Sequence, residues 1–420
     1  MNDPAAAALS TVFREERAAV LATLIRQVGD FQLAEDAVQD AFAAALTAWR
    51  RDGVPDRPGA WITVAARRRA VDRLRRDKSI ADRAERLARL THQEQPAMEE
   101  DRLRLIFTCC HPALDVSAQV ALTLRTLGGL TTTEIARAFL VAKPTMGKRI
   151  VRAKRKIADA HIRYRVPSDE ELPARLRGVL RVVYLIFNEG YSASGGEHLV
   201  RADLCGEAIR LGRLLGELMP GDTEVQGLLA LMLLHDARRA ARVDARGDYV
   251  ALEEQDRELW DRERISEGLR ALARANRPGQ YQLQAAITAL HLRTPEPDWA
   301  GIAELYRALA DLSPSPVVEV NRAAAVGFAH GADAGLELLE PLLADPALES
   351  YQPLHAAHAE LRRRSGDRPG AEGAYRRAIE LSANPVERAE LERRLESLSK
   401  EVFVPRRIDD ASRHRGGRHD

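Results

Sequence analysis

The segment LTTTEIARAFLVAKPTMGKRIVRAKRKI, residues 130–157, contains the pattern that decides the fold of this part of the chain. Thr131 can cap a first helix because Glu134 follows it by three residues, a spacing that lets each side chain bond to the other residue's backbone amide. Pro144 suits the first turn of a second helix. Two short helices joined by a tight turn, the second one basic, predict a helix-turn-helix, the layout that places a helix in the major groove of DNA.

The second helix has an apolar side and a basic side, because Met146, Ile150, Ala153 and Ile157 are spaced by four, three and four residues. We expect Met146 and Ile150 to face the core. The candidates for reading base edges lie near the start of the helix: Lys143, Thr145, Lys148 and Arg149. The candidates for phosphate contacts follow them: Arg152, Lys154 and Arg155. The alternative is a basic surface helix with no groove to enter, which the turn and the cap disfavour.

The charge of the whole chain conceals two parts of opposite sign. The 420 residues have a formal net charge of +1, but residues 1–166 contain 29 Lys and Arg against 20 Asp and Glu, a net +9. The rest of the chain therefore carries −8. This asymmetry indicates a nucleic-acid partner for the basic part. We also expect the acidic part to pack on the basic one and to control its access to DNA.

The composition narrows the class of protein. With 45% hydrophobic and 30% charged residues the chain can bury a core, and its length suggests two to four domains. Aromatic residues make up only 5%, and Ala and Leu dominate the apolar positions, which predicts an all-α fold. Three cysteines favour a reducing compartment. Apolar runs such as Val182–Phe187 are too short to cross a bilayer, and no export signal precedes them, so we expect a cytoplasmic protein with no membrane partner.

Two helices are expected upstream of the helix-turn-helix. Apolar residues recur at three- and four-residue intervals from Leu33 to Ala44, beside an acidic exposed face. The Gly- and Pro-containing loop at residues 50–59 ends this helix. A second helix, from about Ala60 to about Arg76, is rich in arginine.

These stretches, taken together and in this order, resemble the extracytoplasmic-function (ECF) group of bacterial sigma factors in the sigma-70 family. Leu33–Phe42 resembles the helix that docks on the clamp of RNA polymerase, and Pro58–Arg76 resembles the helix that reads the promoter −10 element and melts the strands. Leu130–Ile157 resembles the −35 reader. The resemblance implies core RNA polymerase and promoter DNA as partners, no catalytic activity and no cofactor.

The resemblance also implies two further sets of site residues. The polymerase-binding candidates combine charge, hydrogen bonding and apolar contact: Glu35, Asp36, Val38, Gln39, Asp40 and Phe42. The −10 candidates combine a basic surface with an aromatic ring: Trp61, Arg67, Arg68, Arg69, Arg73 and Arg76. Trp61 fits a core position better than a stacking platform. The alternatives are a merely solvated acidic face, and a surface pairing of Arg68 or Arg73 with Asp72 or Asp77.

The remaining residues, about 250 of them, keep a helical pattern, with helices expected at Leu176–Phe187, Leu204–Met219 and Val225–His235. Ala308, Leu343 and Ala378 recur at 35-residue intervals, as do Gly331 and Gly366, which suggests a tetratricopeptide-like array with a protein or peptide partner. With Phe107–Leu114 and Val182–Ser194, these repeats resemble the sigma-factor subgroup that has a long C-terminal extension. The domains we expect are sigma region 2 at 10–78, a linker at 79–100, sigma region 4 at 101–165, a helical extension at 176–290, tetratricopeptide-like repeats at 291–399 and a disordered tail at 400–420.

Two other function classes stay open at this point. A one-component transcription regulator would bind an operator with its helix-turn-helix and sense a ligand with its repeats, but it has no need of the acidic and arginine-rich helices at Leu33–Arg76. A metal-dependent hydrolase in residues 170–290 would need ligands with a metal-binding spacing. We expect no metal, because the candidate ligands lack that spacing: Cys109, Cys110, His111, His198, His235 and Asp236.

Overall fold

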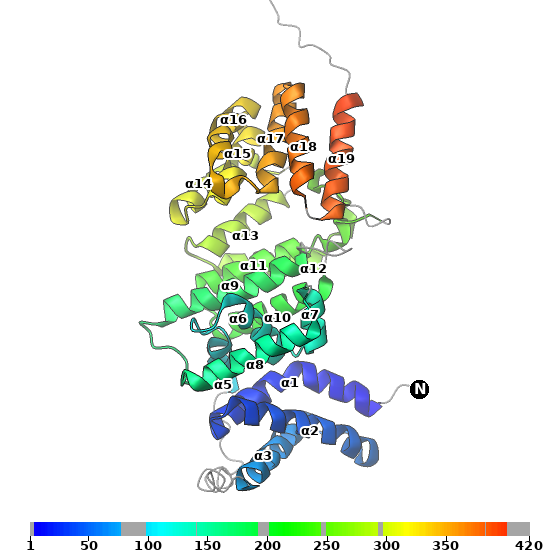
Figure 1. Cartoon of the computed structure of the whole chain (residues 1–420), viewed down its shortest axis with the longest axis vertical. Coiled ribbons are helices and arrows are strands. Elements are labelled where there is room, and N and C mark those ends of the chain that lie inside the picture. Colours follow the sequence, from blue (N-terminus) through cyan, green and yellow to red (C-terminus); the bar gives the residue numbers. More distant parts are fainter. Residues whose placement is uncertain are drawn as a thin grey trace, which may run out of the picture.

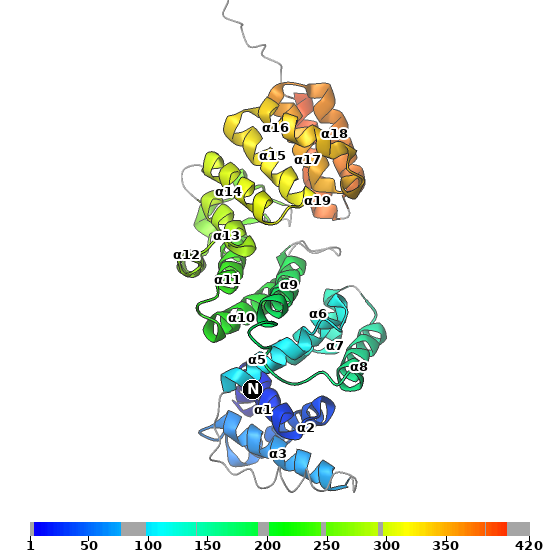
Figure 2. The same cartoon turned by 90° about the vertical axis from the view of Figure 1, so that its left-hand side faces the viewer.

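The computed structural model describes residues 4–76, 98–139, 141–191, 201–244, 249–292, 297–382 and 384–400. Within these ranges every regular element is a helix, and Val243 and Tyr249 form an isolated antiparallel bridge. The predicted all-α fold class is confirmed. Figures 1 and 2 show groups of helices stacked along one long axis, with α1–α3 at one end, then α5–α8, then α9–α13, and α14–α19 at the other end. The linker expected at 79–100 lies outside the described residues up to residue 97, as does the tail expected at 400–420 from residue 401 onwards.

The first three helices are α1 (Pro4–Val28), α2 (Phe31–Asp52) and α3 (Pro58–Arg76). Asp30 caps α2 by accepting a hydrogen bond from the Leu33 backbone amide at 2.9 Å. Gly53, at φ 86°, ends α2 in a conformation that favours glycine. Trp49 of α2 packs edge-to-face on Trp61 of α3, with ring centroids 5.9 Å apart. Trp61 therefore contributes to helix packing, as we expected.

The next four helices are α5 (Met98–Cys109), α6 (Val116–Thr126), α7 (Thr132–Ala138) and α8 (Lys143–Asp159). The predicted capping box is present: the Thr131 amide donates to Glu134 Oε2 at 2.6 Å, and the Glu134 amide donates to Thr131 Oγ1 at 3.2 Å. Pro144 lies in the first turn of α8, and Met146 and Ile150 are buried as expected. The helix pair α7–α8 thus has the predicted helix-turn-helix layout.

These two groups of helices pack against each other, with α1 on α5 and α2 on α8. Arg26 of α1 donates to Asp101 of α5 at 2.9 Å. The Tyr164 hydroxyl, just beyond α8, lies 3.0 Å from the carbonyl oxygens of Ala22 and Asp101. Burial and the charge of Asp101 raise the pKa of Tyr164, so this hydroxyl keeps its proton and can donate.

The C-terminal extension begins with α9 (Leu172–Tyr191), α10 (Ala202–Leu218) and α11 (Thr223–Asp236). Three short 3-10 turns follow, η2 (Arg239–Ala241), η3 (Leu252–Glu254) and η4 (Arg257–Leu259), and then α12 (Arg262–Arg274) and α13 (Gln280–His291). Arg175 of α9 donates to the Phe107 carbonyl at 2.6 Å, and Arg210 of α10 donates to the Leu127 carbonyl at 2.5 Å. A single hydrophobic core runs from α1 to α13, so the extension shares its core with the helix-turn-helix.

The last elements are α14 (Trp299–Leu312), α15 (Pro316–His330), α16 (Ala332–Leu339), η5 (Glu340–Ala344), η6 (Pro346–Leu348), α17 (Gln352–Ser365), α18 (Arg368–Leu381) and α19 (Pro385–Lys400). Each helix packs on the next one along the chain. Gly331 joins α15 to α16 and Gly366 joins α17 to α18, both at positive φ. This position explains why glycine recurs there at an interval of 35 residues. No helix among the described residues is long and apolar enough to span a membrane.

Candidate nucleic-acid and protein interfaces

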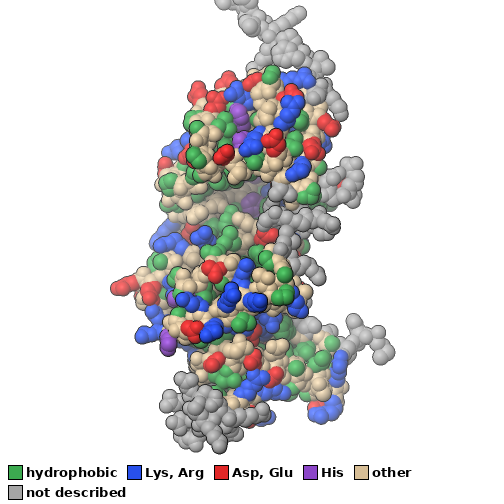
Figure 3. Space-filling model, viewed as in Figure 1, with side chains coloured by type: hydrophobic (Ala, Val, Ile, Leu, Met, Phe, Trp, Pro, Cys, Tyr) green, Lys and Arg blue, Asp and Glu red, His purple; other side chains and the backbone are tan. Residues whose placement is uncertain are grey.

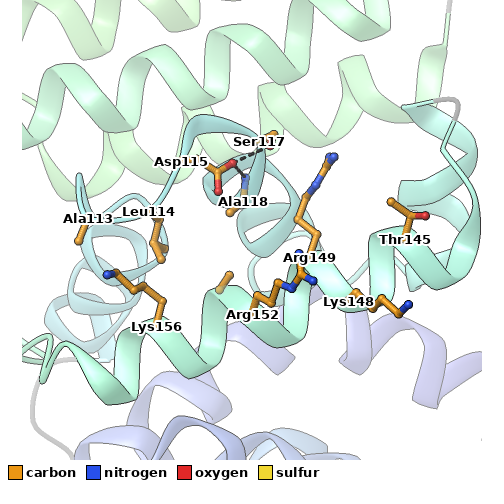
Figure 4. A pocket seen from close by; sticks show the side chains of 11 residues that line it. Ala113, Leu114, Asp115, Ser117, Ala118, Thr145, Lys148, Arg149, Arg152 and Lys156 are labelled. Atoms are coloured by element: carbon orange, nitrogen blue, oxygen red, sulfur yellow. Dashed lines mark hydrogen bonds between the residues drawn. The ribbon is translucent and has the colours of Figure 1, made fainter.

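The basic side of α8 faces solvent. Lys143, Thr145, Lys148, Arg152 and Arg155 are exposed, and Arg149 is half-buried. Figure 3 shows Lys and Arg side chains grouped over α8 on this face of the molecule. In Figure 4, Arg149, Arg152 and Lys156 extend from α8 alongside the turn that carries Asp115. The face presents several cations along one helix, which is the arrangement that phosphate groups require.

Val151 lies in the middle of this face and was not among the predicted site residues. Its side chain is 64% exposed, although it is apolar. Residues 148, 151, 152 and 155 share one side of a helix because they are three or four positions apart. An exposed β-branched residue between cations is suited to contact the methyl group of thymine. The sequence could have identified Val151, because it follows Lys148 by three residues and so lies on the same side of the helix.

Lys154 does not lie on the exposed face. Its ammonium group donates to the carboxylate of Glu35 on α2. Glu35 is only 4% exposed. Arg17 Nη2 and Arg125 Nε lie 3.5 and 3.7 Å from the other oxygen of the same carboxylate. We call these four residues the Glu35 cluster. One carboxylate from α2 thus faces cations from α1, α6 and α8.

The Glu35 cluster has an excess of positive charge in a buried place. The pKa of Arg17 is lowered to about 10, mainly because the side chain is buried; the charge of Glu35 raises this pKa and the charge of Arg125 lowers it. Arg17 also donates to the carbonyl oxygens of Arg125 and Thr126, at 3.2 and 2.8 Å. These contacts connect helices α1–α3 to helices α5–α8.

The polymerase-binding candidates on α2 divide between two sides of that helix. Glu35, Val38 and Phe42 are buried, and Phe42 packs edge-to-face on Phe13 of α1 with ring centroids 5.0 Å apart. Gln39 is exposed, while Asp36 and Asp40 are half-buried. The structure therefore leaves Asp36, Gln39 and Asp40 at least partly at the surface and covers Glu35 together with the two apolar residues, and all six stay predictions.

The −10 candidates lie along α3. Arg73 Nη1 donates to Asp36 at 2.9 Å and Arg73 Nη2 to Asp40 at 2.6 Å, so the partners of Arg73 come from α2 and not from its own helix. Arg68 is exposed. The other candidates are half-buried, except Arg76, which ends α3 and whose side chain is outside the description: Trp61, Arg67 and Arg69. These assignments stay predictions too.

Among the residues that we set aside as metal ligands, Cys110 and Asp236 have other contacts. Cys109 and Cys110 are buried, and Cys110 Sγ lies 3.5 Å from Thr123 Oγ1. Burial raises the pKa of Cys110 to about 11, so this thiol stays protonated. Asp236 pairs with Arg239 and Arg264. No group of three metal-ligating residues occurs in the part of the chain that the structure describes, and His198 lies outside it.

Three family models match the chain. Residues 12–80 match sigma-70 region 2, residues 104–157 match sigma-70 region 4, and residues 175–276 match a family of unknown function, DUF6596. An uncharacterized protein of Rhizobium meliloti (strain 1021) is 42% identical over 401 residues, which cover 92% of this chain and 94% of that protein. The two sigma-70 models coincide with α1–α3 and with α5–α8, where the candidate interfaces lie.

Proposed function

The chain belongs to the sigma-70 family of transcription initiation factors, which are not enzymes, and from this premise we propose that it is a sigma factor of the ECF type. Its partners are core RNA polymerase and promoter DNA. In our proposal it recognises −35 and −10 elements, and the long C-terminal extension regulates it or binds a further protein. The close succession of the region 2 match and the region 4 match along the chain supports the ECF assignment.

The observation that carries the proposal is the exposed basic face of α8, which is the second helix of a helix-turn-helix whose first helix begins with a capping box. Lys143, Thr145, Lys148 and Arg149 lie near the N-terminal end of α8, from which a recognition helix reaches base edges. Arg152 and Arg155 are placed to contact phosphates. Val151 adds a candidate contact to a thymine methyl group. The exposed Arg68 on α3 is our first candidate for the −10 strand.

The Glu35 cluster bears on how such a factor would work. Lys154 is directed at Glu35 and is largely covered, so it is not placed to contact a DNA phosphate in this arrangement, and Glu35 cannot contact polymerase while it is buried. We therefore propose that α8 leaves α2 when the factor binds polymerase. The described arrangement is then a closed form in which part of the docking surface is covered.

The extension would supply a second interface in our proposal. Gly331 and Gly366 both join consecutive packed helices at positive φ, which supports tetratricopeptide-like units. Stacked helix pairs form surfaces that are suited to peptides and protein partners. His355 and Ala359 stand where such a repeat usually has Trp and Gly, so the array would be a degenerate one.

The test is run-off transcription with the full chain and purified core polymerase. The templates are promoters enriched from a random library by the reconstituted holoenzyme. We expect specific start sites that are lost in the double variant Lys148→Ala, Arg149→Ala and kept in the exposed control Arg270→Gln. Binding of the full chain to duplex DNA with no specific transcript from any enriched template would favour the one-component regulator instead.

A further inference from the structure

A cavity of about 780 Å³ lies where the extension helices meet the last helices of the chain. One wall comes from Arg242 and Tyr249, next to η2, and the other comes from α17, α18 and α19, with Tyr351, Tyr375 and Arg394 among the lining residues. Beside it, Arg393 of α19 pairs with Glu254 of η3 at 2.8 Å. Ligand sites occur preferentially at such junctions between units.

Two buried arginines near this cavity lack the partner that a buried charge requires. Arg242 and Arg238 are 6% and 8% exposed. The Arg242 guanidinium lies 3.7 Å above the Tyr191 ring and donates to the Tyr191 carbonyl. Arg238 is 3.3 Å from the Tyr191 hydroxyl and 3.5 Å from His235, and its Nε has no hydrogen-bond partner. Among the described residues, no carboxylate lies within ion-pair distance of either guanidinium.

The acidic residues nearby are already paired. Asp236 binds both Arg239 and Arg264. Glu390 lines the cavity but pairs with Arg393 and Arg394, and Glu387, which also lines it, has contacts of its own. Arg242 is therefore a cavity-lining cation that has no carboxylate counter-ion among the residues that the structure describes.

A buried guanidinium without a carboxylate is unfavourable unless something else supplies the negative charge. Its planar set of donors matches the oxygen atoms of a carboxylate or a phosphate. The half-buried Tyr249 and Tyr351 offer flat apolar surfaces beside it, and each also carries a hydroxyl, whereas Tyr375 is buried and donates its hydroxyl to Glu360 at 3.3 Å. The wall therefore combines an anion-binding group with a surface for an aromatic or other apolar body.

We propose that this cavity binds a small molecule that carries an oxyanion, a carboxylate or a phosphate, on a flat apolar body, with Arg242 as the residue that binds the anion. The ligand would touch both the extension helices and α17–α19, and so would strengthen their association. This site is independent of the interfaces for polymerase and DNA, and its test uses neither.

The experiment is calorimetric titration of the full chain with phenyl phosphate and with benzoate, and with benzyl alcohol as the uncharged counterpart. We expect saturable binding of at least one anion and none of the alcohol. Arg242→Gln removes the cation, and Ala356→Phe fills the cavity from the α17 wall without changing any charge. Each variant should weaken binding at least tenfold: Arg242→Gln because a charge-assisted contact is lost, and Ala356→Phe because its ring occupies the space of the ligand. Arg270→Gln, on the exposed side of α12, should bind as the unchanged chain does.

Thermal unfolding with the same probes gives a second readout. Phosphate-type anions stabilise proteins generally, because they are excluded from protein surfaces, so only the difference between variants counts. A melting temperature that the anions raise in the unchanged chain and in Arg270→Gln, but not in Ala356→Phe, supports the site even if Arg242→Gln fails to fold. Equal increases in all variants, or no saturable binding of either anion, would overturn the proposal. Whichever anion binds more tightly identifies the chemical group that the cavity takes.

Discussion

Glu35 holds a carboxylate in the space between two packed groups of helices, with Arg17, Arg125 and Lys154 around it. Ion pairs at the surface contribute little to stability, but breaking a buried one leaves uncompensated charges behind. We expect Glu35→Gln to lower the free energy of unfolding by about 3 kcal/mol, because the buried Arg17 and the half-buried Arg125 and Lys154 would lose their counter-ion.

Urea unfolding followed by circular dichroism checks this value. Asp36→Asn is the matched control, since Asp36 lies one residue away on the same helix and its pair with Arg73 is more exposed than the Glu35 cluster. We expect the control to lose less than about 1 kcal/mol. Similar losses in both variants would show that the Glu35 cluster does not hold the two groups together.

His235 is a second buried group with a consequence for stability. Burial lowers its pKa well below the ordinary value of 6.5, and so do the charges of Arg238, Arg242 and His291. The folded chain therefore keeps His235 neutral at a pH where the unfolded chain binds a proton. Stability should fall as the pH drops from about 6.5 toward the folded-state pKa, by up to about 1.4 kcal/mol per pH unit from this group. His235→Gln should have a shallower pH dependence by that amount in urea titrations at pH 5 to 7, and an unchanged slope would contradict the assignment.

At the scale of elements, α8 has an apolar side whose spacing made its burial predictable. Met146 and Ile150 are buried, and the capping box before α7 forms with both predicted hydrogen bonds. These features are local, because a cap and a helix period are determined by residues within about one turn of each other. The closed position of α8 on α2 is different, since Lys154 and Glu35 are 119 residues apart and no local pattern connects them.

The burial of residues on α2 likewise has a part that the local sequence pattern predicts and a part that depends on distant elements. The period from Leu33 to Ala44 predicts one buried face, and Ala37 and Ala41 are buried as expected. Glu35, Val38 and Phe42 are buried as well, because α2 is covered on a second side. A carboxylate on an amphipathic helix reads as solvent-exposed unless the packing of distant elements is known.

The exposed face of α8 supports a prediction that separates base reading from phosphate contact. Arg155→Ala should weaken binding about equally for all promoter sequences and reduce the salt dependence of binding by about one phosphate contact. Arg149→Ala should instead change the order of preference among −35 sequences, since a lost base contact costs about 1 to 3 kcal/mol at one position. Holoenzyme binding to a −35 library at several salt concentrations checks both. If Arg149→Ala instead weakened binding equally for all −35 sequences, Arg149 would be reassigned as a phosphate contact.

At the scale of the whole molecule, the basic part of the chain and the acidic extension share a hydrophobic core. The basic part ends near residue 166, whereas one hydrophobic core continues from α1 through α13. Charge counts along a sequence report surface properties and partners, not which side chains pack together. The −8 charge led us to expect that the extension packs on the basic part; α9 does contact α5 and α6, but it does so within a shared hydrophobic core, which the charge count could not indicate, and control of access to DNA stays a prediction.

A consequence is that residues 1–166 should not be stable alone. Removing α9 and α10 would expose the apolar surface of α5 and α6, and contiguous exposed apolar surface promotes association. We expect the fragment 1–166 to aggregate or to be digested rapidly by protease, while the full chain, which keeps the shared core, stays monodisperse. Size-exclusion chromatography and limited proteolysis compare the two. A monodisperse, protease-resistant 1–166 fragment would show that the extension is a separable module.

The closed form itself can be tested through Lys154. Lys154→Met keeps the length and the apolar stem of the side chain but removes the charge that binds Glu35. If the closed form competes with polymerase for α2, weakening it raises the population that can bind, and the apparent affinity for core polymerase should rise several-fold. Binding of labelled chain to immobilised core polymerase, without DNA, measures this.

The readout without DNA matters because Lys154 is also a candidate phosphate contact, whose loss would weaken promoter binding. Lys156→Met is the matched control, since Lys156 is exposed on α8 and is not part of the Glu35 cluster. We expect that variant to bind polymerase as the unchanged chain does. Unchanged or weaker polymerase binding by Lys154→Met would mean that α8 does not need to leave α2, and the docking residues would then have to be sought on the outer side of α2, around Gln39.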